Sequence, residues 1–297
     1  MLKTIIRKLF ATNGYFTIAI RSREPGLLGN LRFSAAYTVP ATCEDWCADP
    51  FLVDDGERTY LFFEKIRGML GRIEVAEVQP DCSLSESTQI LGGDSHFSYP
   101  FVFRRDGGWY MIPESASLGE VALYAAEDFP TKWKKEAVLL NKGAVDTTVF
   151  QWNGGWYLLT FFPSADGEQV TPKAFRMNGT ELEPLTWEQY NPLRVRGAGR
   201  PFLCDGALFR PVQVSKKHIY GNRVAFARVE IEGNTYRELP VCSLKPERVS
   251  GAHVFFDGLH TYNSSERFEA IDLRCGDLKI SKPLQMGRWY FKKFFSG

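Results

Sequence analysis

Three acidic residues occupy comparable places beside apolar, aromatic-rich segments of the chain. Asp49 opens DPFLVDDGERTYLFFE, Asp146 opens DTTVFQWNGGWYLLTF, and Glu114 closes YPFVFRRDGGWYMIPE. A carboxyl group beside residues that are otherwise buried either pairs with a cation or has its pKa raised by desolvation. Two such groups facing one hollow could make or break a glycosidic bond, one acting at the leaving oxygen and the other facing the anomeric carbon. Asp49, Glu114 and Asp146 are therefore the candidate catalytic residues.

A second set of polar residues is expected to line the same hollow and bind substrate. Tyr99, Arg200 and approximately His253 precede later segments at the place that Asp49 takes before the first. Arg200 and Arg210 suit a phosphate or a row of sugar hydroxyls, because guanidinium groups donate several hydrogen bonds in a fixed geometry. The candidate substrate-binding residues are Glu64, His96, Tyr99, Arg200, Arg210, Gln213, His253 and His260.

A purely structural interpretation stays open for several of these residues. Asp49 precedes a proline and could be a turn residue of the Asx type. Glu114 could accept hydrogen bonds from nearby backbone amides, and Arg200 and Arg210 could form ordinary ion pairs. His260, in GLHTY, could be a core histidine with satisfied hydrogen bonds. Convergence of these residues on one cavity would favour chemistry over structure.

The elements that must position these residues repeat about every fifty positions. Five segments share an apolar run, a glycine-containing turn and a second apolar run. Their turn glycines are spaced 47 to 52 residues apart: Gly56, Gly107, Gly154, Gly206 and Gly258. DG, GG and NG turns between β-branched and aromatic residues predict β-hairpins. With the alternating segments between the hairpins, each period holds four strands, which is typical of a β-propeller blade.

The sequence thus predicts an all-β fold, a five-bladed β-propeller with four antiparallel strands per blade, formed by residues 1–297 as a single domain. The innermost strands of a propeller begin near its axis, so the candidate residues would converge on a central funnel. FTIAI (16–20) lies outside the five hairpins and is expected to pair with the last blade, which closes the ring and removes exposed sheet edges. A pair of β-sandwiches is the alternative, because it also spaces short strands regularly.

Composition and charge exclude several classes of function. The 297 residues carry a formal charge of +1, so no overall field attracts nucleic acid. Six cysteines occur singly beside only four histidines, and neither a metal site nor a cofactor is predicted. The first twenty residues mix basic with apolar side chains and offer no signal-peptide cleavage site, and no run reaches the ~20 apolar residues of a membrane span. A cytoplasmic, reducing location is expected.

Several motifs in one order give the chain a family resemblance. They are WCADPFLV, HFSYPFVF, YMIPES, VALYAAEDFPTKW, VDTTVFQWNGGWYLL, RGAGRPF, FRPVQ followed by IYG, and GLHTYN. Together they resemble the N-terminal domain of plant glucosamine inositolphosphorylceramide transferase and its stand-alone bacterial relatives, from about Phe16 to about Leu273. That domain is in turn similar to the five-bladed propeller of arabinanase-like and invertase-like glycosidases and of some mannoside phosphorylases and mannosyltransferases.

The resemblance implies roles for the three acids. It places the base or nucleophile, which the first blade supplies in these enzymes, on Asp49, and Glu114 and Asp146 match the two acids from later blades. We expect Glu114 to act as the acid and Asp146 to orient the sugar or tune the pKa of the acid. The general acid of the hydrolases usually lies in a later blade than Glu114 does. In the plant protein, the recognised transferase chemistry belongs to a separate domain outside the resemblance.

Both ends of the sequence mix basic with bulky apolar residues, MLKTIIRKLF at the start and MGRWYFKKFF at the end. This pattern is typical of a membrane interface, so segments at about 1–14 and 285–297 are expected to hold the protein peripherally at the inner face of the membrane. Such a place favours a glycosyltransferase of cell-surface polysaccharide or glycolipid assembly. Its partners would be an activated donor, a nucleotide sugar or sugar phosphate, and a glycan or lipid-linked acceptor. A glycoside hydrolase or phosphorylase on the same acids, and a non-catalytic glycan-binding propeller, are the alternatives.

Overall fold

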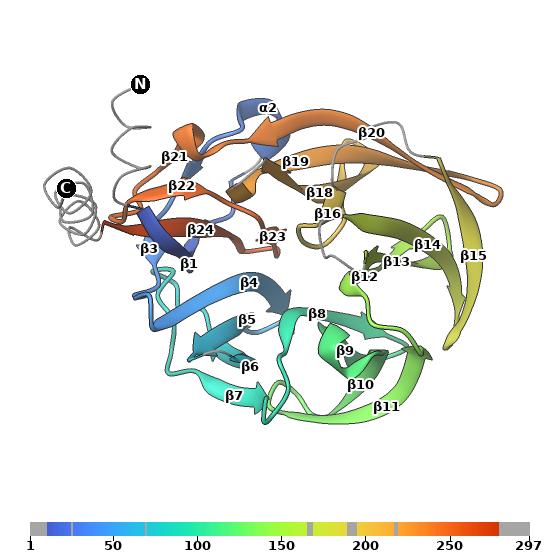
Figure 1. The fold of residues 1–297 in the computed structure, drawn as a ribbon. Coiled ribbons are helices and arrows are strands. Elements are labelled where there is room, and N and C mark those ends of the chain that lie inside the picture. The colour runs from blue at the N-terminus through green and yellow to red at the C-terminus, as the bar shows by residue number, and fades with distance from the viewer. Residues whose placement is uncertain are drawn as a thin grey trace, which may run out of the picture.

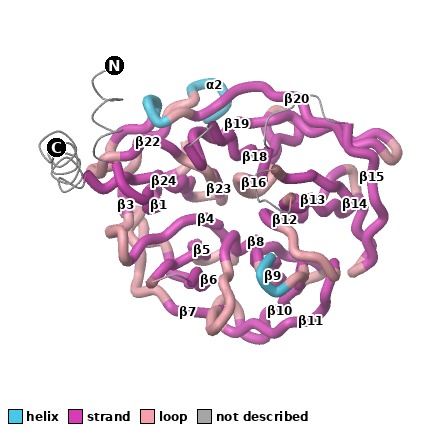
Figure 2. Tube along the Cα trace, in the orientation of Figure 1, coloured by secondary structure: helices cyan, strands magenta, loops and turns pink. Residues whose placement is uncertain are grey.

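Short β-strands make up nearly all the regular structure of the protein (Figure 2). The computed structural model describes residues 11–24, 26–68, 70–164, 169–188, 195–216 and 219–278. Within these ranges, helical structure is confined to α2 (Leu27–Asn30) and two 3₁₀ turns, Ala116–Leu118 and Pro246–Arg248. The all-β class predicted from the alternating apolar residues is therefore confirmed.

The two simplest sheets have four strands each, and all their neighbouring strands are antiparallel (Figure 1). The first runs in the order β4-β5-β6-β7 and the second in the order β8-β9-β10-β11. Their strands are β4 (Asp45–Asp54), β5 (Thr59–Arg67), β6 (Leu70–Glu77), β7 (Thr88–Leu91), β8 (Ser98–Arg105), β9 (Gly108–Glu114), β10 (Val121–Asp128) and β11 (Lys132–Leu140). Each sheet starts with a predicted hairpin and adds two strands, as the repeat predicts.

The third sheet has nine strands because two groups of strands are joined. Its order is β12-β13-β14-β15-β20-β19-β18-β16, with β17 paired to β18. The junction is a parallel pairing of β15 with β20, in which Trp187 lies opposite Tyr236. The strands are β12 (Val145–Trp152), β13 (Gly155–Pro163), β14 (Val170–Asn178), β15 (Glu181–Glu188), β16 (Val195–Gly197), β17 (Phe202–Cys204), β18 (Ala207–Lys216), β19 (Ile219–Glu232) and β20 (Thr235–Leu244). This junction departs from the expected separate groups of four strands.

The two ends of the described chain meet in a fourth sheet. β1 (Ala11–Ser22) lies between β24 (Phe268–Leu278) and β3 (Tyr37–Thr38) and pairs antiparallel with both. Residues 16–20 of β1 lie opposite residues 270–274 of β24. The prediction that FTIAI pairs with the last repeat is therefore confirmed.

The fifth predicted hairpin, AHVFFDGLHTYN, is wrong. β22 (Phe256–Gly258) and β23 (Tyr262–Ser264) both pair with β24 rather than with each other. A Cβ built on Gly258 would lie 2.1 Å from the carbonyl oxygen of Gly221, so this glycine serves a close approach of two backbones instead of a turn. β2 (Phe33–Ser34) and β21 (Val249–Ser250) form a separate parallel pair.

Turn chemistry explains why three of the other hairpins form where they do. Both central residues of each turn have positive φ, as a type I′ hairpin turn requires: Asp106–Gly107, Asn153–Gly154 and Asp205–Gly206. Aspartate and asparagine tolerate this conformation, and glycine adopts it without a steric cost. The two-residue turns fix the register of each hairpin and thereby the place of its first residue.

Apolar side chains fill the spaces between neighbouring sheets. Phe51 of β4 packs edge to face on Tyr99 and Phe101 of β8, with ring centroids 4.8 and 5.6 Å apart. On the other side, Leu61 of β5 shares a buried cluster with Ile18 of β1. Because successive sheets pack on each other around a centre (Figure 1), segments far apart in sequence are held rigidly toward one another.

The two segments expected at a membrane interface lie almost entirely outside the described residues. Only residues 11–14 of the first segment are described, as part of β1. Within the described ranges, no helix has the length and apolar character needed to cross a membrane. Peripheral attachment stays a prediction from the sequence.

Candidate active site

A cavity of about 380 Å³ lies where strands of the four large sheets converge. Its volume is within the range of ligand-binding pockets, roughly 300 to 1,000 Å³. The lining residues are Phe16, Trp46, Ala48, Asp49, Glu64, Ile66, Gly68, His96, Ser98, Glu114, Asp146, Arg196, Gln213, Tyr220 and His260. Residues spread over most of the sequence thus meet at one place.

Three positions beside the cavity share an uncommon backbone conformation. Asp49, Tyr99 and Asp146 have φ angles of 51°, 45° and 52°, in the left-handed region. At each position the pairing of its strand with the next one shifts register. Such a bulge bends the strand and changes the direction of a side chain. These positions, which the sequence predicts to be equivalent, therefore share the same backbone geometry.

Arg196 holds two of the acids together. Its guanidinium makes a bidentate ion pair with Asp146, from Nε to Oδ2 at 2.7 Å and from Nη2 to Oδ1 at 2.8 Å, and Nη2 lies 3.4 Å from Oε2 of Glu114. The Asp146 amide donates to the same Glu114 oxygen at 3.2 Å. Burial raises the pKa of Glu114 to about 8, with help from the carboxylates of Asp146 and Asp49 and against the charge of Arg196. Glu114 can therefore carry a proton at neutral pH.

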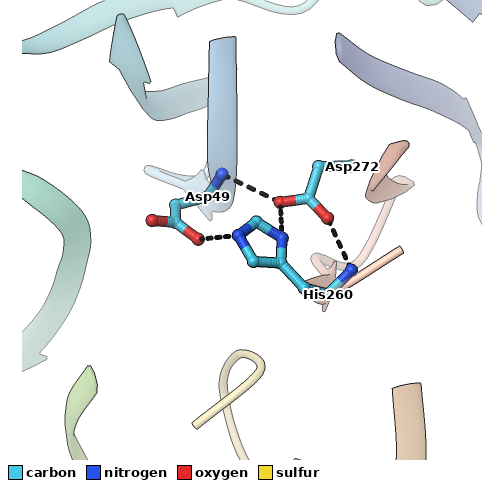
Figure 3. A group of neighbouring side chains, drawn as sticks. All are labelled: Asp49, His260 and Asp272. Carbon is cyan, nitrogen blue, oxygen red and sulfur yellow. Dashed lines mark hydrogen bonds and ion pairs between the residues drawn. The ribbon is translucent and has the colours of Figure 1, made fainter. Parts of the chain in front are cut away.

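Asp49 belongs to a second network, with His260 and Asp272 (Figure 3). Its Oδ1 accepts a hydrogen bond from the Thr261 hydroxyl at 2.9 Å, and its Oδ2 accepts one from the Tyr99 amide at 3.3 Å. Nε2 of His260 lies 3.6 Å from Oδ1. Burial raises the pKa of Asp49 to about 7, opposed by the charge of His260 and reinforced by nearby carboxylates. Asp49 therefore changes between carboxyl and carboxylate near neutral pH.

Glu64 and His96 form a third polar pair on the wall of the cavity. Nε2 of His96 lies 3.2 Å from Oε1 of Glu64, and its Nδ1 accepts a hydrogen bond from the Gly71 amide at 2.9 Å. The Glu64 contact raises the pKa of His96 against the effect of burial. Protonation of Nδ1 would break the bond from Gly71, so the neutral ring, donating from Nε2, satisfies both contacts. In either protonation state of the ring, Nε2 can donate to Glu64.

One cluster has the residue types of a metal site. A potential ligand atom from each of Asp49, His260 and Asp272 lies within 4.8 Å of the others. Oδ1 of Asp272 accepts the amides of His260 and Thr261, and its Oδ2 accepts the Asp49 amide and lies 2.5 Å from Nδ1 of His260. These hydrogen bonds account for the donor set, and we assign no metal to it.

The structure brings seven of the eleven predicted site residues to the cavity wall: Asp49, Glu64, His96, Glu114, Asp146, Gln213 and His260. Tyr99 lies behind the wall, buried, where its hydroxyl accepts a hydrogen bond from the Gly199 amide at 2.8 Å. Its backbone amide binds Asp49. Tyr99 therefore supports the site instead of lining it.

The other three predicted binding residues are not among the lining residues. Arg200 donates to the backbone carbonyl of Val102, and Arg210 makes an ion pair with Glu238 at 2.6 and 2.8 Å. Both guanidinium groups are already used inside the fold. His253 is exposed in a loop, because the segment that contains it does not form the predicted hairpin.

Four residues of the site were missed by sequence reasoning: Arg196, Tyr220, Thr261 and Asp272. Arg196 lies in RVRGAGR, where Gly197 and Gly199 mark close backbone approaches. Asp272 stands in the apolar strand segment EAIDL, where a buried acid needs partners. A stricter search for charges inside apolar strands would have found Asp272.

Gly197 is predicted to be intolerant of any side chain. A Cβ on it would lie 2.6 Å from Cβ of Asp146 and 2.8 Å from the Tyr99 hydroxyl. Gly197→Ala should therefore lower the free energy of unfolding by about 1–3 kcal/mol, as overpacking does. Urea denaturation would measure this loss, with Gly29→Ala as the control, because a Cβ on Gly29 meets nothing within 4 Å. An unchanged midpoint in Gly197→Ala would contradict the packing around Asp146.

Solved structures of propeller-like glycosidases share this nearly all-β ring of sheets. The GH43_1 enzyme from Xanthomonas citri has a similar structure, with a TM-score of 0.55 and 13% identity, over 80% of this chain and 88% of that one. The GH32 beta-fructofuranosidase of Bombyx mori also gives a TM-score of 0.55, with 14% identity, over 71% of this chain and 54% of that one. At these identities the likeness shows the fold alone.

Sequence similarity shows the family to which the chain belongs. Residues 33–263 match the family model described as glucosamine inositolphosphorylceramide transferase 1, N-terminal, and the chain belongs to this family. Glucosamine inositolphosphorylceramide transferase 1 of Arabidopsis thaliana is 34% identical over 70% of this chain, and that of Oryza sativa subsp. indica is 33% identical over 66%. The matched part spans 28% of the length of each relative.

Proposed function

We propose that the chain is a carbohydrate-active enzyme that transfers a glycosyl group, with Asp49 and Glu114 as its acid–base pair. The observation that carries this proposal is that two carboxyl groups with pKa values raised to about 7 and about 8 face one cavity. Glu114 protonates the leaving oxygen, and Asp49 faces the anomeric carbon as base or nucleophile. Asp146, clamped by Arg196, orients the sugar and keeps the Glu114 proton in place.

The family supports transfer as the reaction. The relatives are named as transferases, and this chain matches their N-terminal region. We therefore propose an activated sugar donor and a glycan or lipid-linked acceptor, in cell-surface polysaccharide or glycolipid assembly. A cytoplasmic protein held peripherally at the membrane by its basic and aromatic ends would suit such an acceptor. We also infer five blades of four strands each: β16 and β17 together supply one strand of the fourth blade, beside β18, β19 and β20, and β22 and β23 together supply one strand of the fifth, beside β24, β1 and β3.

One observation favours a second candidate, a glycoside hydrolase or phosphorylase. The arginines expected to bind the donor phosphate, Arg200 and Arg210, contact the protein interior. Arg196 is the one arginine or lysine among the described lining residues, and two carboxylates already bind it. A cavity of this charge accepts a neutral glycoside more readily than a diphosphate.

A transferase and a hydrolase can be distinguished by testing three classes of sugar donor in parallel. The protein would be incubated with a panel of nucleotide sugars, of sugar phosphates and of oligosaccharides, each with and without a glycan acceptor. Glu114→Gln is the inactive comparison, because glutamine fills the same space without a transferable proton. Acceptor-dependent product from an activated donor supports the transferase, and sugar released from an oligosaccharide alone supports the hydrolase. If the wild type and Glu114→Gln bound glycan equally and neither turned over any donor, the proposal of an enzyme would be wrong. The glycan-binding module would then be the remaining candidate.

The same pair of acids predicts a narrow pH optimum. Asp49 must be ionised and Glu114 protonated, so kcat/KM should rise as pH passes about 7 and fall as it passes about 8. The sign follows from burial, which raises both pKa values above those of exposed carboxyl groups. A pH–rate profile from 5 to 10 would check this, with a stability curve to exclude unfolding. A flat profile across neutral pH would contradict these roles.

A further inference from the structure

We propose that His260 is a positioning residue for Asp49: fixed by Asp272, its imidazolium holds the Asp49 carboxylate in place and sets the lower pH limit of the reaction. This inference rests on the proposed function. It concerns His260, Asp272 and Asp49, and it does not involve Glu114, the other member of the acid–base pair. Figure 3 shows the order of the three side chains, with the imidazole between the two carboxyl groups.

Asp272 determines which nitrogen of His260 carries a proton. Its side chain is fully buried and accepts three backbone amides, those of Asp49, His260 and Thr261, at 2.9 to 3.1 Å. This many donors stabilise the ionised form, and together with His260 they lower the pKa of Asp272 against the effect of burial. A carboxylate can only accept, so Nδ1 of His260, 2.5 Å from Oδ2, must donate. Nε2 is then the nitrogen that faces Asp49.

The ring of His260 has little freedom to turn away. Phe16 stacks on it with centroids 4.4 Å apart and an interplanar angle of 21°, and Tyr220 meets it edge-on at 5.4 Å. Gly221 lies so close that a Cβ there would be 2.7 Å from Cβ of His260. Thr261, the next residue, donates its hydroxyl to Asp49 at 2.9 Å. Residues 260 and 261 therefore hold Asp49 in place, His260 through its charge and Thr261 through a hydrogen bond.

A positive imidazole at this place has a defined electrostatic effect. Asp272 raises the pKa of His260 to about 9 against the effect of burial, so the ring is charged at neutral pH. Several groups face this pair of residues from the surrounding strands. Asp49 is faced by Glu64, Glu114, Asp146, Asp272 and His260, and His260 is faced by Asp49, Asp272, Arg196 and Tyr220. Without the imidazolium, Asp49 would face chiefly other carboxylates and would keep its proton to higher pH.

Two variants and one spectroscopic measurement test this role. His260→Gln keeps a polar side chain but removes the charge, so the pKa of Asp49 should rise by roughly 1 to 3, the effect of losing a nearby opposite charge. The acid limb of the pH–rate profile should then move up toward about 8, where Glu114 titrates, and the maximal kcat/KM should fall. Asp272→Asn should move the acid limb in the same direction but less far, because His260 loses the carboxylate that keeps it charged while Asp49 loses a nearby negative charge. The matched control is His253→Gln, which lies in an exposed loop outside the cavity and should leave the profile unchanged. A histidine with a merely structural role would lower thermal stability without moving the limb.

NMR titration decides the question even if a variant is unstable or no substrate turns over. In the wild-type protein, the ¹³C shift of the His260 ring should report an imidazolium through neutral pH, and the Asp49 carboxyl should titrate at higher pH in His260→Gln. A neutral His260 ring at pH 7, or an Asp49 titration unchanged by His260→Gln, would overturn the proposal. Loss of the proposed function would appear differently, as absent turnover with every donor while these titrations behave as expected.

Discussion

Asp49→Asn is expected to lower kcat/KM by about 10² to 10⁴, the range that one acid–base group contributes. Asparagine keeps the size of the side chain and one acceptor for the Thr261 hydroxyl or the Tyr99 amide, the two donors that hold Asp49. It cannot gain or lose a proton near neutral pH. The measurement is the initial rate with the donor identified for the wild type, together with ligand affinity by calorimetry. Affinity should stay close to that of the wild type.

The control for this substitution is Asp55→Asn, in the turn of the same hairpin. Asp55 is exposed and accepts the amides of Glu57 and Arg58, as a turn residue does. The same chemical change outside the cavity should leave the rate unaltered. If Asp49→Asn retained full turnover, Asp49 would have the turn role that its place before Pro50 also allows, and the acid–base assignment would be wrong.

The fold could be predicted from the sequence where local chemistry determines it. Asn153–Gly154 and similar turns fix hairpins within about ten residues, and the strand of residues 16–20 had no partner nearby, so its pairing with β24 followed. The parallel pairing of β15 with β20 could not be predicted, because it depends on how two strand groups sit in space. The failed fifth hairpin has the same origin, since β24 offers both short strands a better partner than either offers the other.

The sequence repeat predicts some residues of the site correctly and others not. Asp49 and Asp146 could be predicted because each precedes a hairpin of the repeat. In the structure, equivalent bulges place both residues beside the cavity. Arg200 stands near the corresponding place in a later repeat, yet it donates to Val102 in the interior. Residue type alone does not tell whether a guanidinium faces a ligand or a carbonyl. Asp272 shows the converse, because its role depends on amides that reach it from β4 and from the segment before β23.

Arg210 gives the largest predicted effect on stability. Its side chain is 1% exposed, pairs with Glu238 through two hydrogen bonds and lies 5.3 Å from the Phe161 ring centroid. Arg210→Met should lower the free energy of unfolding by about 3–5 kcal/mol, because it leaves the buried Glu238 carboxylate without its counter-ion. Urea denaturation at pH 7 would measure the loss. Arg237→Met is the control, since Arg237 pairs with an exposed glutamate and such pairs contribute about 0–1 kcal/mol.

The double variant Arg210→Met with Glu238→Leu separates the two interpretations of Arg210. If the arginine serves the fold, removing both charges should restore most of the lost stability, because a buried ion pair can be replaced by apolar groups of similar volume at little cost. Sugar affinity should then be near that of the wild type, since neither residue lines the cavity. If the arginine binds the donor, affinity would stay low in the stable double variant. Arg210 also donates to the backbone carbonyl of Arg196 at 3.2 Å, so a modest loss of rate with unchanged affinity would reflect displacement of the Arg196 clamp.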